Sequence, residues 1–331
     1  MSKRHAVVLA TFLMALSAIV YAQPKPPLPG GYPNKPIRII VGAAPGGGAD
    51  IQARIVAPRL SDRWKNPVVV VNQPSGVGGV IAMEGVARSA PDGYTLMLSA
   101  SSSVLNATMV TKTTMDVRRD FIPVAQLTAQ PWILSVPASL PVTTVKELIA
   151  YAKGRPGELN YASAGNGSAA HLGMEMFNSI TGTRIAHIPY KGIGPGLVDM
   201  IAGRVQMLLA TPAATSPHMK SGKVKALAVT SARRSRLLPD VPTLVESGLT
   251  DFDVSGWFGL FAPTGTPAPI VEALNREVVE ILKLAEVQAQ LTADGSEPAP
   301  VSSAEFRASM LRELDRWDKV IKAINFKLDA E

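Results

Sequence analysis

Ser168 and His171 are the two residues whose types and spacing come nearest to a catalytic arrangement in this sequence. Because they are three positions apart, a helix would place both side chains on one face, as a serine nucleophile and its histidine base require. The sequence contains no Gly-x-Ser-x-Gly nucleophile elbow, however, and no third residue to orient the histidine is evident. A serine that caps a helix, followed by a hydrogen-bonded histidine, is the favoured interpretation, and a secreted serine hydrolase using this pair is the alternative.

Two glycine-rich stretches have the composition of turns that bind an anion through backbone N–H groups at the start of a helix. The first ends in Gly48, Ala49 and Asp50, where a phosphate loop would have glycine, lysine and a hydroxyl residue, and a carboxylate there repels phosphate. The second, at 76–79, lacks the full dinucleotide fingerprint. We therefore expect no nucleotide cofactor, and we interpret Asp50 as the N-cap of a helix.

Metal and thiol chemistry are not expected either. The chain has no cysteine, and its four histidines include no pair at metal-ligand spacing. The remaining candidates are hydroxyls, glycines and an amide at expected strand ends, with Lys191 either a cation for the site or a solvated loop residue. Such groups hold a carboxylate by hydrogen bonds but do not readily break covalent bonds, so the residues indicate a binding protein rather than an enzyme.

These turns follow strands in a repeating pattern. Continuous apolar runs at 37–41, 68–71 and 95–99 predict buried strands, with helices between them, the first running from Asp50 to about Trp64. This alternation predicts a doubly wound parallel sheet, in which ligands bind beyond the carboxyl ends of the strands. The alternation recurs later, with strands expected at 159–162, 185–188, 207–210 and 225–230.

Two longer extended segments, 124–136 and 254–261, are interpreted as crossings between the two α/β units, the first of them broken at Gln130-Pro131. The predicted fold class is therefore α/β, with two doubly wound domains that hinge about an interdomain cleft. We expect domain 1 to contain residues 32–126 and 252–331, and domain 2 to contain residues 127–251. In the last helix, expected at 303–326, an apolar stripe is interpreted as a packing face.

The N-terminus has the pattern of a secretory signal peptide at residues 1–22. A basic start is followed by an apolar run at 6–20 and by Val20-Tyr21-Ala22, a small-x-small cleavage site. We expect cleavage after Ala22 and a periplasmic protein. The formal net charge of +7 is spread along the chain without a block of Lys and Arg, and aromatic residues make up only 5% of the sequence, so nucleic acid is not an expected partner.

A series of short motifs occurs in one order along the chain. They are Tyr-Pro-Asn-Lys-Pro-Ile-Arg at 32–38, Ala-Pro-Gly-Gly-Gly-Ala-Asp at 44–50, Pro-Asp-Gly-Tyr-Thr-Leu at 91–96, Gly-Asn-Gly-Ser at 165–168 before His-Leu at 171–172, Pro-Tyr-Lys-Gly at 189–192, Leu-Pro-Asp-Val-Pro-Thr at 238–243 and Ala-Pro-Thr-Gly-Thr-Pro at 262–267. With these motifs the chain resembles the tripartite tricarboxylate transporter substrate-binding proteins, the Bug or TctC family of periplasmic receptors, over essentially its whole length after the signal peptide.

The resemblance implies a two-domain flytrap receptor of the type II periplasmic-binding-protein architecture. Such a receptor delivers a carboxylated solute to inner-membrane transporter subunits, and we expect it to be a monomer. In the family, the turns corresponding to 43–50 and 163–168 hold one carboxylate of the ligand, largely through backbone amides and ordered waters. Carried onto this chain, that proximal group is Ala43, Ala44, Gly47, Asp50, Ser163, Gly165 and Ser168. The distal group is Ser99 and Ser101 from the serine run, with Asn166, His171, Ala210 and Thr211.

Two departures from the family pattern bear on the ligand. The family usually has Asn-Arg-Pro-Gly-Ala-Gly-Gly-Asn near position 73, where this chain has Asn-Gln-Pro-Ser-Gly-Val-Gly-Gly-Val at 72–80. It also often has an acidic residue where Ala210 stands. Loss of that acid removes a partner for an amino group, so we expect an amine-free mono- or dicarboxylate, aliphatic or aromatic. A ligand-sensing receptor for a membrane kinase would share this site and is a further alternative.

Overall fold

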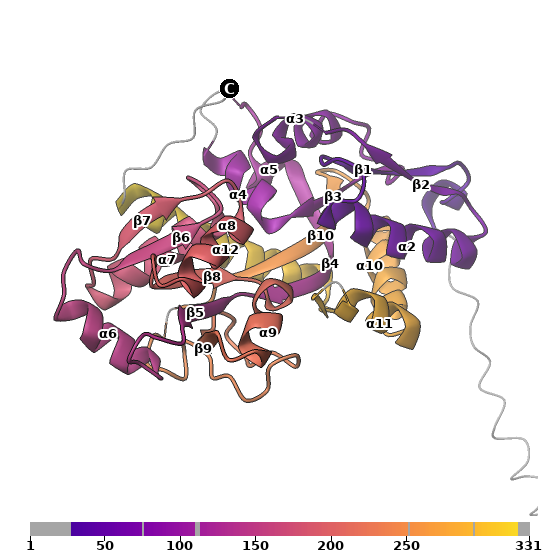
Figure 1. Ribbon diagram of the computed structural model, residues 1–331. Coiled ribbons are helices and arrows are strands. Elements are labelled where there is room, and N and C mark those ends of the chain that lie inside the picture. Colours follow the sequence, from indigo (N-terminus) through magenta and orange to yellow (C-terminus); the bar gives the residue numbers. More distant parts are fainter. Residues whose placement is uncertain (1–27, 75, 110–112, 251, 294, 324–331) are drawn as a thin grey trace, which may run out of the picture.

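The computed structural model describes residues 28–74, 76–109, 113–250, 252–293 and 295–323 (Figure 1). The predicted signal peptide, at 1–22, lies outside the described residues. Within those residues, no helix combines the length and the apolar character needed to cross a membrane. Two separate β-sheets, each covered by helices, make up the molecule.

The first sheet is built on the apolar strand β1 (Ile37–Val41), of which only Arg38 is exposed. It pairs in parallel with β2 (Val68–Asn72) on one side and with β3 (Thr95–Ala100) on the other. Beyond β3 the order continues with β10 (Ser255–Pro263), β4 (Phe121–Pro131) and the short β11 (Glu297–Pro298), each antiparallel to its neighbour.

The second sheet repeats this arrangement. Its β6 (Asn160–Ser163) pairs in parallel with β7 (Ala186–Pro189) and β8 (Met207–Ala210). Next to β8 lies β5 (Ile133–Pro137), antiparallel both to β8 and to β9 (Val224–Val229). Both sheets therefore share one strand order, which is β2-β1-β3-β10-β4 in the first sheet and β7-β6-β8-β5-β9 in the second. In each sheet the fourth strand of this order, β10 or β5, is antiparallel to both of its neighbours.

The reversed strand is where the fold departs from the predicted all-parallel sheets, and the crossings explain it. Only Trp132 separates β4 from β5, so the chain passes directly from one sheet into the other without a crossover helix. It thus enters the second sheet at the edge where the other strands end, and must run against them. The predicted break at Gln130-Pro131 falls instead at Trp132, because β4 continues through Pro131.

Thr230, directly after β9, is hydrogen-bonded to both crossings. The Trp132 N–H donates to Thr230 Oγ1 at 3.0 Å, the Thr230 N–H donates to the Trp132 carbonyl at 2.9 Å, and the Val254 N–H donates to the Thr230 carbonyl at 3.0 Å. A few residues at this junction connect the sheets, as in proteins that close by a hinge. The hinge and the domain boundaries at 126 and 252 stay predictions.

Helices cover both faces of each sheet. They are α2 (Gly48–Trp64), α3 (Gly76–Ala87), α4 (Ser101–Met109), α5 (Val117–Asp120), α6 (Val145–Lys153), α7 (Ala169–Thr181), α8 (Ile193–Ile201), α9 (Pro212–Lys220), α10 (Ala268–Leu282), α11 (Ala285–Ala293) and α12 (Ser303–Ala323), with a 3-10 turn, η1 (Pro29–Gly31), before β1. The last helix packs against both β4 and α7. The side chains of Phe306, Met310, Leu314 and Trp317 are at most 3% exposed, which confirms the predicted packing face.

Candidate ligand-binding site

The candidate residues follow the carboxyl ends of two equivalent pairs of strands. In the first sheet β1 leads into the turn 42–47 and β3 leads into α4; in the second sheet β6 leads into the turn 164–168 and β8 leads into α9. In each sheet these two strands flank the point where the strand order reverses. Open α/β sheets bind ligands at this switch point, so the fold places the predicted site where such sites occur.

The starts of α4 and α7 also come together near the crossings. Ser101 of α4 and Ala169 of α7 line one small cavity of about 10 Å³, beside Trp132 and Gly256 of the two crossings. That space is enough for about one water molecule. The structure thus brings the start of α4, with the predicted Ser101, next to the start of α7 at the junction between the sheets.

Asp50 is not the N-cap that the sequence predicts. Helix α2 begins at Gly48, and Gly47 is its N-cap. Asp50 is therefore the third residue of the helix, and it is buried, with 2% of its surface exposed. Its side chain reaches back along the chain, where Oδ2 accepts a hydrogen bond of 2.8 Å from the N–H of Gly46. Aspartate is common both at the N-cap and in the first helical turn, so the local sequence does not distinguish the two positions. In this structure the carboxylate is buried within the helix start.

The Asp50 carboxylate is the centre of a network that shapes the first turn. Arg54 Nε donates to both oxygens, at 3.0 and 2.9 Å, and Asn72 Nδ2 donates to Oδ1 at 2.9 Å. Asn72 Nδ2 also donates to the Ala43 carbonyl at 3.1 Å. The hydrogen bond from Arg54, and then those from Gly46 and Asn72, hold the pKa of this carboxyl below its usual value against the opposing effect of burial. Asp50 is thus an internal anchor, and its direct contact with a ligand stays a prediction.

A close backbone approach fixes the other end of this turn. A Cβ added to Gly42 would lie 2.9 Å from the Cα and 3.1 Å from the carbonyl oxygen of Gly79 in α3. Gly79 itself has a φ of +90°, a backbone conformation that residues with a side chain rarely adopt. The two glycine-rich stretches are therefore in direct backbone contact at Gly42 and Gly79. A side chain at either position would collide with the other backbone segment.

The two serines of the first sheet are engaged in different ways. Ser99 is 2% exposed, and its Oγ lies 3.9 Å from Met83 Sδ. Ser101 Oγ accepts a hydrogen bond of 3.3 Å from the N–H of Trp257 in β10. A ligand contact by either hydroxyl stays a prediction and would require the side chain to exchange its present partner.

The second turn is held by its own serines. Ser163 Oγ accepts the Gly165 N–H at 3.1 Å, and Ser168 Oγ donates to the Gly165 carbonyl at 2.7 Å. Gly165 has a φ of +123°, so the turn requires glycine there. As predicted, Ser168 caps α7, with its Oγ accepting the His171 N–H at 3.3 Å.

The rings near this turn do not form the hydrolase pair. His171 Nδ1 accepts the N–H of Gly167 at 3.0 Å, while Ser168 Oγ donates to a backbone carbonyl. The short contact between a serine and a histidine is a different one, 2.6 Å between Ser163 Oγ and His187 Nε2. Sequence reasoning missed His187 because only the parallel register of β6 and β7, which sets Tyr161 beside His187, brings it to the turn.

The remaining predicted residues of the second sheet lie at the end of β8 and in the loops that follow β6 and β7. Ala210, at the end of β8, is fully buried, and Thr211 is the N-cap of α9. Asn166 is exposed at the tip of the turn, and Lys191 is exposed in the loop after β7. The alternative roles of Lys191, a cation for the site or a solvated residue, stay open.

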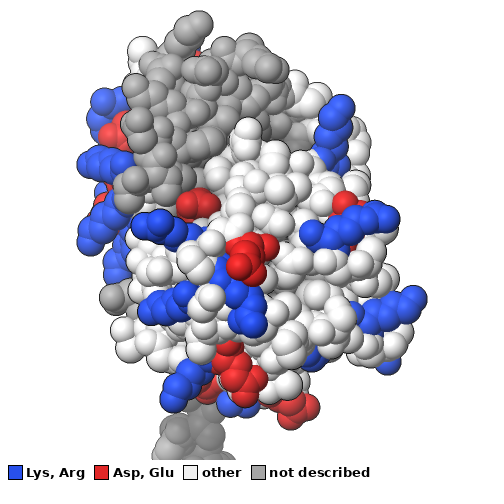
Figure 2. Space-filling view, turned by 60° about the vertical axis from the view of Figure 1, so that its left-hand side comes forward, with Lys and Arg blue, Asp and Glu red and all other residues white. Residues whose placement is uncertain are grey.

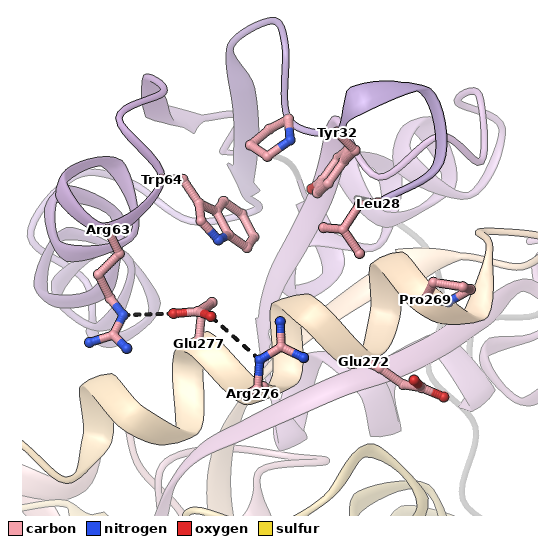
Figure 3. Close-up of a pocket in the computed structure, with 9 residues that line it drawn as sticks. Leu28, Tyr32, Arg63, Trp64, Pro269, Glu272, Arg276 and Glu277 are labelled. Carbon is pink, nitrogen blue, oxygen red and sulfur yellow. Dashed lines mark hydrogen bonds and ion pairs between the residues drawn. The ribbon is translucent and has the colours of Figure 1, made fainter. Parts of the chain in front are cut away.

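A pocket of about 540 Å³ lies away from both turns, between the end of α2 and the start of α10 (Figure 3). Trp64 and Tyr32 form one wall, with ring centroids 5.8 Å apart. Three of its charged groups pair with one another, because Glu277 accepts from Arg63 at 2.7 Å and lies 3.5 Å from Arg276. On the face drawn in Figure 2, blue Lys and Arg side chains are interspersed with red Asp and Glu.

Comparison with known proteins identifies the family of this chain. Residues 52–326 match the family described as tripartite tricarboxylate transporter family receptor. Protein BugT of Bordetella pertussis is 39% identical over 299 residues, covering 90% of this chain and 91% of BugT.

Two solved structures are also similar. The R. palustris protein Rpa4515 with adipate is 37% identical, with a TM-score of 0.68 over 88% of this chain and 97% of that one. A TctC solute binding protein from Polaromonas, solved with no ligand, is 31% identical, with a TM-score of 0.81 over 88% of this chain and 99% of that one. The chain therefore belongs to the tripartite tricarboxylate transporter family receptors, the Bug or TctC solute-binding proteins, which are receptors and not enzymes.

Proposed function

We propose that this chain is a periplasmic receptor that captures an amine-free mono- or dicarboxylate, aliphatic or aromatic, and delivers it to a tripartite tricarboxylate-type membrane transporter. The observation that carries the proposal is the pair of turns at 42–47 and 164–168, each preceding a helix N-terminus in one of two sheets of equal strand order. The family, named for receptors of that transporter, supports the delivery step.

Backbone N–H groups at the starts of α2 and α7 suit a carboxylate. A helix N-terminus presents unpaired N–H groups and a partial positive charge, which favour an anion. The carboxylate next to the first turn is that of Asp50 in α2. It is paired with Arg54 at 2.9 Å, so its negative charge is compensated within the protein. The ligand's other end would reach the residues at the ends of β3 and β8.

The end of β8 supports the choice of an amine-free ligand. Ala210 offers no side-chain acceptor there, and a ligand ammonium would be desolvated without a partner, which costs free energy. The adipate of the R. palustris relative is a dicarboxylate without an amino group.

Closure of the two halves on the ligand fits the TM-scores. The score is higher for the ligand-free Polaromonas protein, 0.81, than for the adipate-bound R. palustris protein, 0.68, although the latter is more identical in sequence. A change in the relative orientation of two domains lowers such a score even when each domain is alike. We propose that the structure described here is an open form and that ligand binding closes it.

Paired ligands that differ only by an amino group test the proposed specificity. Calorimetric titration is expected to give dissociation constants for succinate and glutarate at least about tenfold lower than for aspartate and glutamate, a difference of about 1.4 kcal/mol in binding free energy. Tighter binding of the amino acids would contradict the amine-free specificity, and no binding of any carboxylate in a wider panel would contradict the proposed function itself.

A further inference from the structure

Two histidine rings are stacked directly behind the second turn. The centroids of His171 and His187 are 4.0 Å apart with an interplanar angle of 13°, and Tyr161 stacks on His187 at 5.0 Å. His171 is 8% exposed. Stacking holds the three rings in fixed positions. A positive charge on either histidine would therefore lie close to the turn at 164–168.

Each histidine is bonded to a group of the turn itself. His171 Nδ1 accepts the N–H of Gly167 at 3.0 Å, so this ring nitrogen carries no proton in the structure. His187 Nε2 lies 2.6 Å from Ser163 Oγ, which also accepts the N–H of Gly165. One of the N–H groups that could donate to a bound carboxylate is therefore engaged by a neutral imidazole.

The other titratable groups around the rings come from several elements. Tyr161 of β6 donates to Glu175 of α7 at 2.6 Å, and β8, which packs on α7, has no titratable side chain in the segment Met-Leu-Leu-Ala. From α12, Glu313 lines the small cavity beside Ala169, and accepts the indole N–H of Trp257 at 2.6 Å.

Beyond β7, Tyr190 donates to Asp199 of α8 at 2.8 Å, Asp199 pairs with Arg204 at 2.6 Å, and Lys191 follows in the loop. These groups follow the carboxyl end of β7, beside the second turn, where the Tyr190 N–H donates to the Ser163 carbonyl at 3.1 Å. Within α7, the one charged side chain is the carboxylate of Glu175.

We propose that capture of a carboxylate at the second turn is coupled to the uptake of one proton by the His171–His187 pair. The inference rests on the proposed function, because it requires an anion at this turn. A proton from solvent that binds His171 Nδ1 ends its acceptance of the Gly167 N–H, which becomes a donor for the ligand. The resulting imidazolium also places a positive charge behind the carboxylate.

The direction of the coupling follows from the electrostatics. Burial lowers the pKa of His171, with Glu175 opposing, and burial together with His171 lowers the pKa of His187 to about 4, so both rings are neutral near pH 7 without a ligand. An adjacent carboxylate favours the charged form and raises these values. Only one proton is expected, because two imidazolium rings 4.0 Å apart would repel each other. Binding should therefore tighten as the pH falls from 8.5 to 6.5.

Calorimetry with adipate in phosphate and in Tris buffer measures the protons exchanged, because the two buffers differ in ionisation enthalpy. The wild-type protein is expected to take up about 0.5–1 proton per adipate at pH 6.5 and close to none at pH 8.5, and its dissociation constant should fall about tenfold over that range, as one pKa unit implies. The His171→Asn variant keeps an acceptor for the Gly167 N–H but cannot titrate, so its exchange should reflect the ligand alone. His218→Asn, in the last turn of α9, should behave like the wild type.

The outcomes separate the two proposals. Adipate binding without proton uptake in the wild type overturns the coupling and leaves the proposed function standing. Uptake that survives in His171→Asn but disappears in Glu313→Gln assigns the proton to Glu313, whose pKa burial raises to about 7, and also overturns the coupling. If neither adipate nor any other carboxylate binds, both proposals fail together.

Discussion

Replacing Asp50 by alanine is expected to weaken carboxylate binding about 30- to 100-fold and to lower the free energy of unfolding by about 2–4 kcal/mol. The variant removes the acceptor of Gly46, Arg54 and Asn72 at once, so the first turn loses its anchor to α2 and β2. A purely electrostatic view makes the opposite prediction, because removing a negative charge beside an anion site should tighten binding. Calorimetry with adipate and urea unfolding measure the two effects.

A surface variant supplies the control for Asp50. Glu280→Ala removes a carboxylate that pairs with Lys283 at 2.7 Å while both side chains are about half exposed, and it should change neither the affinity nor the unfolding midpoint. Tighter binding by Asp50→Ala, with the fold intact, would show that this carboxylate opposes the ligand instead of organising its turn.

Replacing Gly42 by alanine is expected to destabilise the protein by about 1–3 kcal/mol, the usual range for overpacking, and to weaken binding about tenfold. The added Cβ would meet the backbone of Gly79, at 2.9 Å from its Cα, and backbone atoms cannot rotate away as a flexible side chain does. The displaced segment leads directly from β1 into the first turn. Chemical denaturation and calorimetry with adipate measure both effects.

Gly85→Ala, in the last turn of α3, is the matched control for Gly42. A Cβ there meets no atom within 4 Å, so the substitution is expected to raise the free energy of unfolding by about 0.4–1 kcal/mol, as at other compatible helical positions, without changing the affinity. Equal stability of Gly42→Ala and the wild type would mean that α3 can move away from β1, and that the turn is not fixed by this contact.

The alternation of strands and helices could be predicted from the sequence because the central strands of the first sheet, β1 and β3, are largely buried on both faces. Ile39 and Ile40 are at most 2% exposed, and such strands appear in sequence as continuous apolar runs. The first crossing could be predicted because the extended segment at 124–136, thirteen residues long, exceeds the length of an ordinary strand. The direction of β5 and β10 could not, because strand pairing is a long-range property with no local signature.

The positions of the two turns could be predicted from the sequence, but the contacts within them could not. The glycine-rich turns are visible in the sequence, and the resemblance to the family brought them together across two sheets. The role of Asp50 depends on Asn72, 22 residues away on β2, and the contact of His187 with Ser163 depends on the register of β6 and β7. Local spacing carries no information on either pair, although the Asp50–Arg54 pair has the i, i+4 spacing of helical ion pairs.

Closure of the two sheets on a carboxylate can be measured as a distance between two spin labels. The chain has no cysteine, so Ile81→Cys on α3 and Val198→Cys on α8, both more than 60% exposed, would carry the only labels. Ile81→Cys with Val69→Cys on β2, within the first sheet and its helices, is the control pair. Saturation with adipate is expected to shorten the distance between α3 and α8 and to leave the control distance unchanged. An unchanged distance between α3 and α8 in protein that calorimetry shows to be saturated would contradict capture by closure between the two turns.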